Sequence, residues 1–175
     1  MRFLLEGRPG SGKSTIARHV ADRLRDDGIA ISGFVTEEIR ERGRRLGFSI
    51  ERFGGERAVL ARVDLPGPPR VGRYGVDLEA LERLAVPALE EAGGPDVAII
   101  DELGKMELAS GAFRDAVSTL FDRPVRVLAT VQTSAHPLTD ALKRRADIET
   151  FRVTTANRDE LPQLLAARLA STDLD

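Results

Sequence analysis

The eight residues from Gly7 to Ser14 read GRPGSGKS and match the pattern G-x-x-x-x-G-K-[ST] at every fixed position. Glycines at these positions let the backbone curl so that successive N–H groups point inward at an anion. Lys13 would place a full charge beside the β- and γ-phosphates of a nucleotide, Ser14 a hydroxyl on Mg²⁺, and Thr15 a contact to the α-phosphate. The pattern alone does not choose between hydrolysis, phosphoryl transfer and switching. The residues that we expect to bind nucleotide here are Gly7, Arg8, Pro9, Gly10, Ser11, Gly12, Lys13, Ser14 and Thr15.

Two acids, Asp101 and Glu102, follow the apolar run Val97–Ile100. Such a run is typical of a strand buried on both faces of a parallel sheet, and ligands of these sheets bind beyond the carboxyl ends of the strands. We expect Asp101 to support Mg²⁺ and Glu102 to orient or activate a water molecule beside the γ-phosphate. Lys13 and Glu102 are therefore candidate catalytic residues. The alternative for Glu102 is a solvated acid at a strand end.

Lys105 is a third catalytic candidate because it closely follows the acidic pair and is one of only three lysines among 26 basic residues. It could stabilise charge on a transferring phosphoryl group. A salt bridge to Glu107 or Glu102, or a solvated position in a loop, fits the sequence equally well. Thr130 ends another apolar run, where it would either contact the γ-phosphate or its water or only cap the strand.

The remaining candidates are less specific. Among the clusters of positive charge, Lys143–Arg145 is our choice for a cation that contacts the transition state, because a planar guanidinium suits phosphate. Most arginines should be solvated partners of the 28 acids. Asn157 and Arg158 could lie beside the nucleotide base, but we favour Asn157 as a helix cap and Arg158 as a first-turn surface residue.

Alternating strands and helices would have to position these residues. Hydrophobic periodicity and turn residues predict strands over residues 2–6, 29–36, 38–42, 45–53, 57–63, 97–101, 125–131 and 148–153, and helices over 14–27, 78–89, 111–121, 138–145 and 158–170. The Pro/Gly-rich residues 65–75 read as a loop, and Asp77 and Ser110 as helix caps. The alternation predicts an α/β protein of three layers, α/β/α, with a mostly parallel sheet. Strands joined by short turns must pair antiparallel, so residues 38–63 should form an antiparallel extension.

Composition narrows the class of protein. A chain of 175 residues should form one domain, residues 1–175. The absence of cysteine excludes disulfides, thiolate zinc sites and a cysteine nucleophile, and two distant histidines argue against a histidine-based metal centre. The net charge of −2 gives no support for a nucleic-acid partner or a polybasic membrane anchor. With neither a signal peptide nor a long apolar run, we expect a cytoplasmic monomer without membrane contact.

Five stretches together resemble the cancer-related nucleoside-triphosphatase family, which also occurs in thermophilic bacteria and archaea. In chain order they are GRPGSGKST, GFVTEEIRERGRRLGF, VGRYGVDLEALE, IIDELGKMEL and FRVTTANRDEL. The resemblance implies a P-loop nucleoside-triphosphatase that uses Mg²⁺ and hydrolyses ATP, GTP, CTP, UTP and TTP to the diphosphate and phosphate. It also implies a second nucleotide-binding stretch, formed by Ala98, Ile99, Ile100, Asp101, Glu102, Leu103, Gly104 and Lys105. Residues 132–145 match the family less clearly.

Two other functions remain open at this point. A nucleotide or small-molecule kinase would use the same phosphate-binding loop, but it would need a site for the acceptor, and Glu102 favours activation of water instead. A regulatory or RNA-associated switch would turn over slowly until its partner bound. Loose base specificity is compatible with the chain, which has one tyrosine and no tryptophan for stacking.

Overall fold

The computed structural model describes residues 1–93 and 96–171. Its strands are β1 (Arg2–Glu6), β2 (Ile31–Glu41), β3 (Arg44–Arg52), β4 (Arg57–Arg62), β5 (Arg70–Val71), β6 (Tyr74–Val76), β7 (Val97–Leu103), β8 (Arg126–Val131) and β9 (Glu149–Arg152). Its helices are α1 (Lys13–Asp26), α2 (Leu78–Glu90), the 3₁₀ helix η1 (Glu107–Ala109), α3 (Gly111–Asp122), α4 (Pro137–Lys143) and α5 (Leu161–Ala170).

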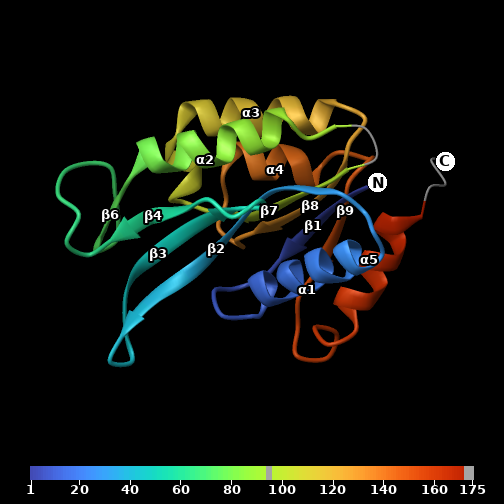
Figure 1. Cartoon of the computed structure of the whole chain (residues 1–175), viewed down its shortest axis with the longest axis horizontal. Coiled ribbons are helices and arrows are strands. Elements are labelled where there is room, and N and C mark those ends of the chain that lie inside the picture. The colour runs from blue at the N-terminus through green and yellow to red at the C-terminus, as the bar shows by residue number, and fades with distance from the viewer. Residues whose placement is uncertain (94–95, 172–175) are drawn as a thin grey trace.

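All nine strands join one sheet in the order β5-β6-β4-β3-β2-β7-β8-β1-β9. The pairs β2–β7, β7–β8, β8–β1 and β1–β9 are parallel. The pairs on the other side of β2 are antiparallel. The predicted parallel sheet with an antiparallel extension is confirmed, but the sheet is mixed and not mostly parallel, because four of the strand pairs in the described residues are parallel and four are antiparallel. The extension projects to the left in Figure 1.

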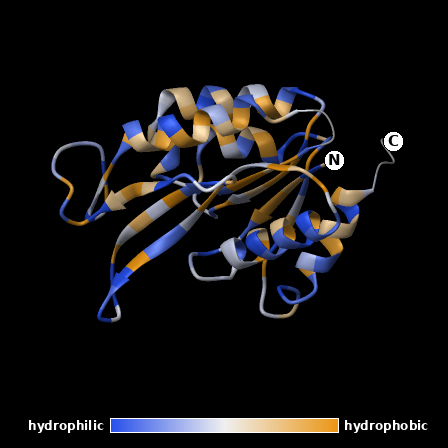
Figure 2. Ribbon diagram, in the orientation of Figure 1, coloured by the Kyte–Doolittle hydropathy of each residue, from blue (hydrophilic) through white to orange (hydrophobic). Residues whose placement is uncertain are grey.

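Helices cover both faces of this sheet. In Figure 1, α2, α3 and α4 lie above it and α1 and α5 lie below it. Successive strand residues point to opposite faces, so that Leu4 belongs to the core beneath α2 and α3, whereas Phe3 and Leu5 pack with α1 and α5. In Figure 2 orange segments mark the central strands, and blue and orange alternate along the helices. The parallel strands are therefore buried on both faces, as their near-continuous apolar runs predict.

Two segments differ from the expectation. The strands expected at 29–36 and 38–42 form one strand, β2, because its start pairs with β7 and its remainder pairs with β3. The segment 65–75, expected as a loop, contains the short hairpin β5–β6, which the pairing of β6 with β4 attaches to the sheet. In both cases a partner distant in sequence decides the structure.

Helix caps were predicted with mixed success. The side chain of Asp77 accepts a hydrogen bond from the Ala80 N–H at 2.9 Å, and that of Ser110 accepts one from the Phe113 N–H at 3.0 Å. The prediction for Asn157 is wrong, because α5 begins only at Leu161. Asn157 instead accepts a hydrogen bond from the Thr154 N–H at 2.8 Å and closes the turn before the helix.

We expect Asp77→Ala to lower the free energy of unfolding by about 1 kcal/mol, because the first turn of α2 loses its side-chain cap. Asp77→Asn should restore most of that loss, since asparagine caps about as well as aspartate. Urea unfolding followed by circular dichroism measures both variants. Equal stability of Asp77→Ala and the parent chain would contradict a stabilising role for the cap.

Candidate active site

The phosphate loop, Gly7 to Ser14, leads from β1 into the first residues of α1 and is closed by a hydrogen bond from the Ser11 N–H to the Arg8 carbonyl. Gly10 and Gly12 have φ values of +78° and +100°, in the left-handed region that favours glycine. A Cβ on Gly7 would come within 2.4 Å of the Ser11 Oγ. That Oγ is buried and has no hydrogen-bond partner among the residues that the structure describes. A group with oxygen acceptors inside the loop would satisfy it, which fits a phosphate.

Lys13 is held inside the loop rather than extended into solvent. Its side chain is 4% exposed, and its Nζ donates to the Gly7 carbonyl at 2.9 Å and to the Arg8 carbonyl at 3.2 Å. The same Nζ lies 3.8 Å from the Glu102 Oε2. The two candidate catalytic residues from β7 and the phosphate loop therefore face each other.

Asp101 is fully buried beneath the loop, and three donors from separate elements contact its carboxylate. The Ser14 Oγ at 2.9 Å and the Thr130 Oγ1 at 2.8 Å donate to Oδ1, and the Thr36 N–H lies 3.5 Å from Oδ2. Burial raises the pKa of Asp101, and the bonds from Thr130 and Ser14 oppose that rise. The contact also connects the two residues predicted to hold Mg²⁺, Ser14 and Asp101.

Glu102 lies at the edge of the same site, with its side chain 19% exposed. Burial raises its pKa, the charge of Lys13 lowers it, and the neighbouring Asp101 raises it further. The Oε1 is buried and has no hydrogen-bond partner within residues 1–93 and 96–171. An acceptor of this kind, beside a lysine and a phosphate loop, can receive a hydrogen bond from a water molecule.

Sequence reasoning gave Thr130 two alternative roles but did not foresee its partner: Thr130 is buried, and its Oγ1 donates a hydrogen bond to Asp101. Two other contacts of this site were missed. The Thr36 amide was unpredictable, because only the pairing of β2 with β7 brings it to Asp101. Gln132 contacts Glu102. It comes two residues after Thr130, and residues at that spacing lie on the same side of an extended chain, so the spacing could have revealed it.

Glu107 is a buried acid that sequence reasoning used only as a partner for Lys105. It is 5% exposed, and its Oε2 accepts a hydrogen bond from the Gly104 N–H at 3.2 Å. Burial, and then the charges of Glu102 and Asp101, raise its pKa to about 8. Glu107 is therefore a largely neutral carboxyl at neutral pH and supports the turn that follows β7.

The remaining candidate cations, Lys105 and the cluster Lys143–Arg145, have different surroundings. Lys105 is exposed and makes no ion pair with any described residue, so the expected alternative of a bridge to Glu107 or Glu102 is wrong. Lys143 pairs with Glu6, immediately before the phosphate loop. Arg145 pairs with Asp122 and Asp147, which removes it from consideration as a free phosphate-binding cation.

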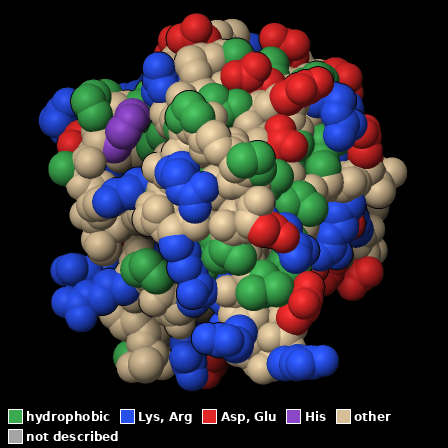
Figure 3. Space-filling view, turned by 90° about the vertical axis from the view of Figure 1, so that its left-hand side faces the viewer, with side chains coloured by type: hydrophobic (Ala, Val, Ile, Leu, Met, Phe, Trp, Pro, Cys, Tyr) green, Lys and Arg blue, Asp and Glu red, His purple; other side chains and the backbone are tan. Residues whose placement is uncertain are grey.

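Positive side chains gather on the face of the molecule that carries the carboxyl ends of the parallel strands. Figure 3 shows this face, with lysines and arginines over much of its lower part and acids toward its upper right.

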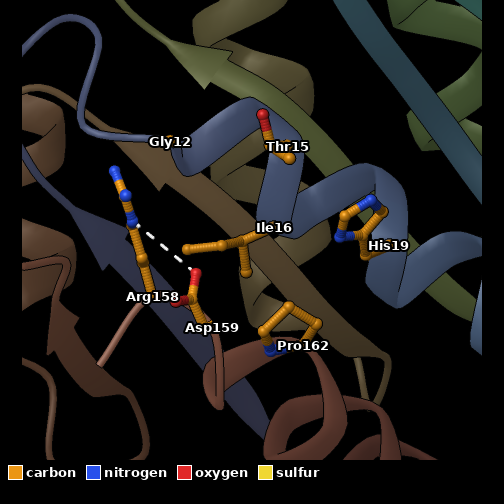
Figure 4. A pocket seen from close by; sticks show the side chains of 7 residues that line it. All are labelled: Gly12, Thr15, Ile16, His19, Arg158, Asp159 and Pro162. Atoms are coloured by element: carbon orange, nitrogen blue, oxygen red, sulfur yellow. Dashed lines mark ion pairs between the residues drawn. The ribbon is translucent and has the colours of Figure 1, made fainter. Parts of the chain in front are cut away.

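Two cavities border the phosphate loop. The first, of about 350 Å³, is lined by residues of α1 and of the segment that leads into α5: Gly12, Thr15, Ile16, His19, Arg158, Asp159 and Pro162. The second, of about 370 Å³, is lined in part by the phosphate loop itself, and Arg158 lines both cavities. Figure 4 shows Arg158 and Asp159 facing α1 across the first cavity. Arg158 is thus outside α5, contrary to its expected place in the first turn of that helix.

Within residues 1–93 and 96–171, no group of three or more His, Cys, Asp or Glu side chains is arranged to hold a metal. In the same part of the chain, no helix has the length and apolar character needed to cross a bilayer.

Comparison with known proteins identifies the family. A model of the family described as NTPase matches residues 2–166. Nucleoside-triphosphatase THEP1 of Thermotoga sp. strain RQ2 is 44% identical over 92% of this chain and 91% of its own length. The human cancer-related nucleoside-triphosphatase is 40% identical over 90% of both chains.

Solved structures agree with these matches. The crystal structure of THEP1 from Aquifex aeolicus has a TM-score of 0.88 at 34% identity, covering 98% of this chain and 100% of that one. The solution structure of the human cancer-related protein has a TM-score of 0.85 at 37% identity, covering 98% of both. These likenesses confirm the predicted α/β P-loop fold and the resemblance drawn from the sequence. The chain belongs to the nucleoside-triphosphatase family that includes these thermophile and human proteins.

Proposed function

We propose that the chain hydrolyses nucleoside triphosphates to the diphosphate and phosphate, with Mg²⁺ as cofactor and little discrimination between bases. The observation that carries this proposal is the contact of Lys13 with Glu102 at 3.8 Å, formed by the sequence neighbours of the hydrogen-bonded pair Ser14 and Asp101. A phosphate-binding cation thus lies beside a carboxylate whose Oε1 accepts no hydrogen bond from the described part of the chain. We also propose that the enzyme is a single-domain cytoplasmic monomer that needs no nucleic acid.

The residues present fit Mg²⁺. The Ser14 hydroxyl and the Asp101 carboxylate offer oxygen atoms, the ligands that this ion prefers, and they already lie 2.9 Å apart. Proteins commonly bind Mg²⁺ through one or two such groups together with the phosphates of the substrate, so a cage of protein ligands is not required. When bound, the ion neutralises charge on the β- and γ-phosphates.

The protein's own residues bind the phosphates and activate the water molecule. The loop amides and Lys13 hold the β- and γ-phosphates, and the Ser11 hydroxyl offers one more donor. Glu102 orients a water molecule and accepts its proton as the water oxygen bonds to the γ-phosphorus. The bond from that phosphorus to the β–γ bridging oxygen breaks, and the diphosphate leaves with the bonding electrons.

Lys105 is our proposed additional cation for the transferring phosphoryl group. Its ammonium is exposed and makes no ion pair with the part of the chain that the structure describes. It follows Gly104, whose amide is fixed by buried Glu107. Gly104 has no room for a Cβ, which would come within 2.9 Å of both Glu107 Oε2 and Gln132 Nε2.

Phosphate release from ATP and Mg²⁺, without any acceptor, tests the reaction. The parent chain should release phosphate, and Glu102→Gln should lower the turnover number by about 10²–10⁴ while binding changes little, because the amide fills the same space but accepts no proton. Normal turnover in Glu102→Gln would exclude the role given to Glu102. Release that required an added nucleoside, nucleotide or polynucleotide would identify a kinase instead.

Lys13→Ala should weaken binding of ADP and of ATP by roughly 2–5 kcal/mol, because a buried ammonium facing the phosphates is lost. Isothermal titration calorimetry measures the loss. Arg44→Ala, which removes one charge from an exposed position of β3, is the matched control and should bind almost normally. Comparable losses of nucleotide affinity in both variants would mean that Lys13 acts only through the positive charge that it adds to the whole protein.

Glu107→Gln should flatten the dependence of stability on pH. In the folded chain the pKa of Glu107 is about 8, above its unfolded value of roughly 4.3, so the folded state holds the proton more tightly. The unfolding free energy of the parent should therefore fall as pH rises between these values. Urea unfolding at pH 5 and pH 8 should show a smaller fall in the variant, and parallel profiles would contradict a buried neutral carboxyl.

A further inference from the structure

The cavity between α1 and the start of α5 has the position expected for the next part of a nucleotide beyond its phosphates. Its lining includes Gly12 of the phosphate loop and Thr15 in the first turn of α1, but neither Asp101 nor Glu102. Ser14 points to Asp101, and a helix turns about 100° per residue, so Thr15 faces a different side. A triphosphate with its reacting end at Glu102 therefore directs its other end toward Thr15 and this cavity.

The lining of the cavity suits a flat ring better than it suits a second phosphate. Ile16 and Pro162 are buried and give it an apolar wall, while Thr15, His19 and Asp159 are exposed along it. Its volume of about 350 Å³ lies within the range of small-ligand sites. The exposed carboxylate of Asp159 would repel an additional anion.

Arg158 is the side chain best placed to contact such a ring. Figure 4 shows it extending from the loop before α5 toward the start of α1. Its side chain is 49% exposed, and its one ion pair with a described residue is the 3.6 Å contact with its neighbour Asp159. A guanidinium is planar and stacks on aromatic faces, whereas an ammonium cannot present such a surface.

We propose that this cavity binds the base of the nucleotide, which stacks on the Arg158 guanidinium against Ile16 and Pro162. Every nucleobase has a face that can stack, so recognition of this kind tolerates all bases. The proposal deepens the proposed function, because it assumes that the loop holds the phosphates. It gives the loose base preference a structural cause, namely a site that uses a ring face in place of a fixed set of hydrogen bonds.

Nucleoside diphosphates and pyrophosphate separate the base from the phosphates without any turnover. Calorimetric titrations with ADP, CDP and pyrophosphate, each with Mg²⁺, should show that the parent chain binds ADP and CDP about tenfold or more tightly than pyrophosphate. Arg158→Ala should lose about tenfold in affinity for both nucleotides and leave the affinity for pyrophosphate unchanged.

Two further variants isolate the stacking surface. Arg158→Lys keeps the charge but not the plane, so it should resemble Arg158→Ala; affinity like that of the parent would overturn stacking. Arg152→Ala alters the neighbouring cavity, and a selective loss of nucleotide affinity there would assign the base to that cavity instead. An equal loss for pyrophosphate in Arg158→Ala would place Arg158 on the phosphates.

The outcomes also distinguish this proposal from the proposed reaction. If ADP and pyrophosphate bind the parent chain equally well, the base site is refuted, whereas phosphate release from ATP would still support hydrolysis. If the chain prefers ADP but releases no phosphate, hydrolysis is refuted and the base site stands. A loss confined to ADP, with CDP unaffected, would overturn recognition by stacking alone.

Discussion

The buried carboxylate of Asp101 is the group on which the arrangement of the site depends. Placing a carboxylate inside a protein is costly unless donors satisfy its oxygens. Here the donors come from α1, β8 and β2, through Ser14, Thr130 and the Thr36 amide. The same hydrogen bonds that offset the burial of Asp101 therefore fix the phosphate loop, the central strands and the start of the extension relative to one another.

Three carboxyl groups, those of Asp101, Glu102 and Glu107, gather at this point, and the Lys13 Nζ lies 3.8 Å from the Glu102 Oε2. Asp101 raises the pKa of Glu102, and Glu102 and Asp101 both raise the pKa of Glu107. Perturbed pKa values of this kind cluster at functional sites, and a ligand that brings positive charge would relieve the repulsion between the carboxylates. Arginine carries most of the positive charge elsewhere, in ion pairs near the surface. A compact ammonium with three donors fits between the Gly7 and Arg8 carbonyls, where a broad guanidinium would not.

The features that were predicted correctly are those that depend on residues close together in the sequence. The loop pattern, the apolar run before Asp101 and the caps at Asp77 and Ser110 all depend on neighbours along the chain. Thr130 could not be understood in that way, because its partner lies in the adjacent strand. The cap predicted at Asn157 failed because a turn closed by its side chain delays the helix until Leu161. The continuous β2 and the β5–β6 hairpin likewise follow from pairing that no local pattern encodes.

Because β2 is one continuous strand, the antiparallel extension cannot be separated from the parallel part of the sheet. One strand pairs in parallel with β7 at its start and antiparallel with β3 along the rest, so both halves of the sheet share a backbone. Ile50 and Leu60 of the extension belong to the same core as Leu81 and Leu84 of α2. Excising the extension would uncover that helix and remove the segment beyond Thr36 that holds the strand in register. The extension is thus an integral part of the scaffold and not a detachable module, and a minimal version of this enzyme must retain it.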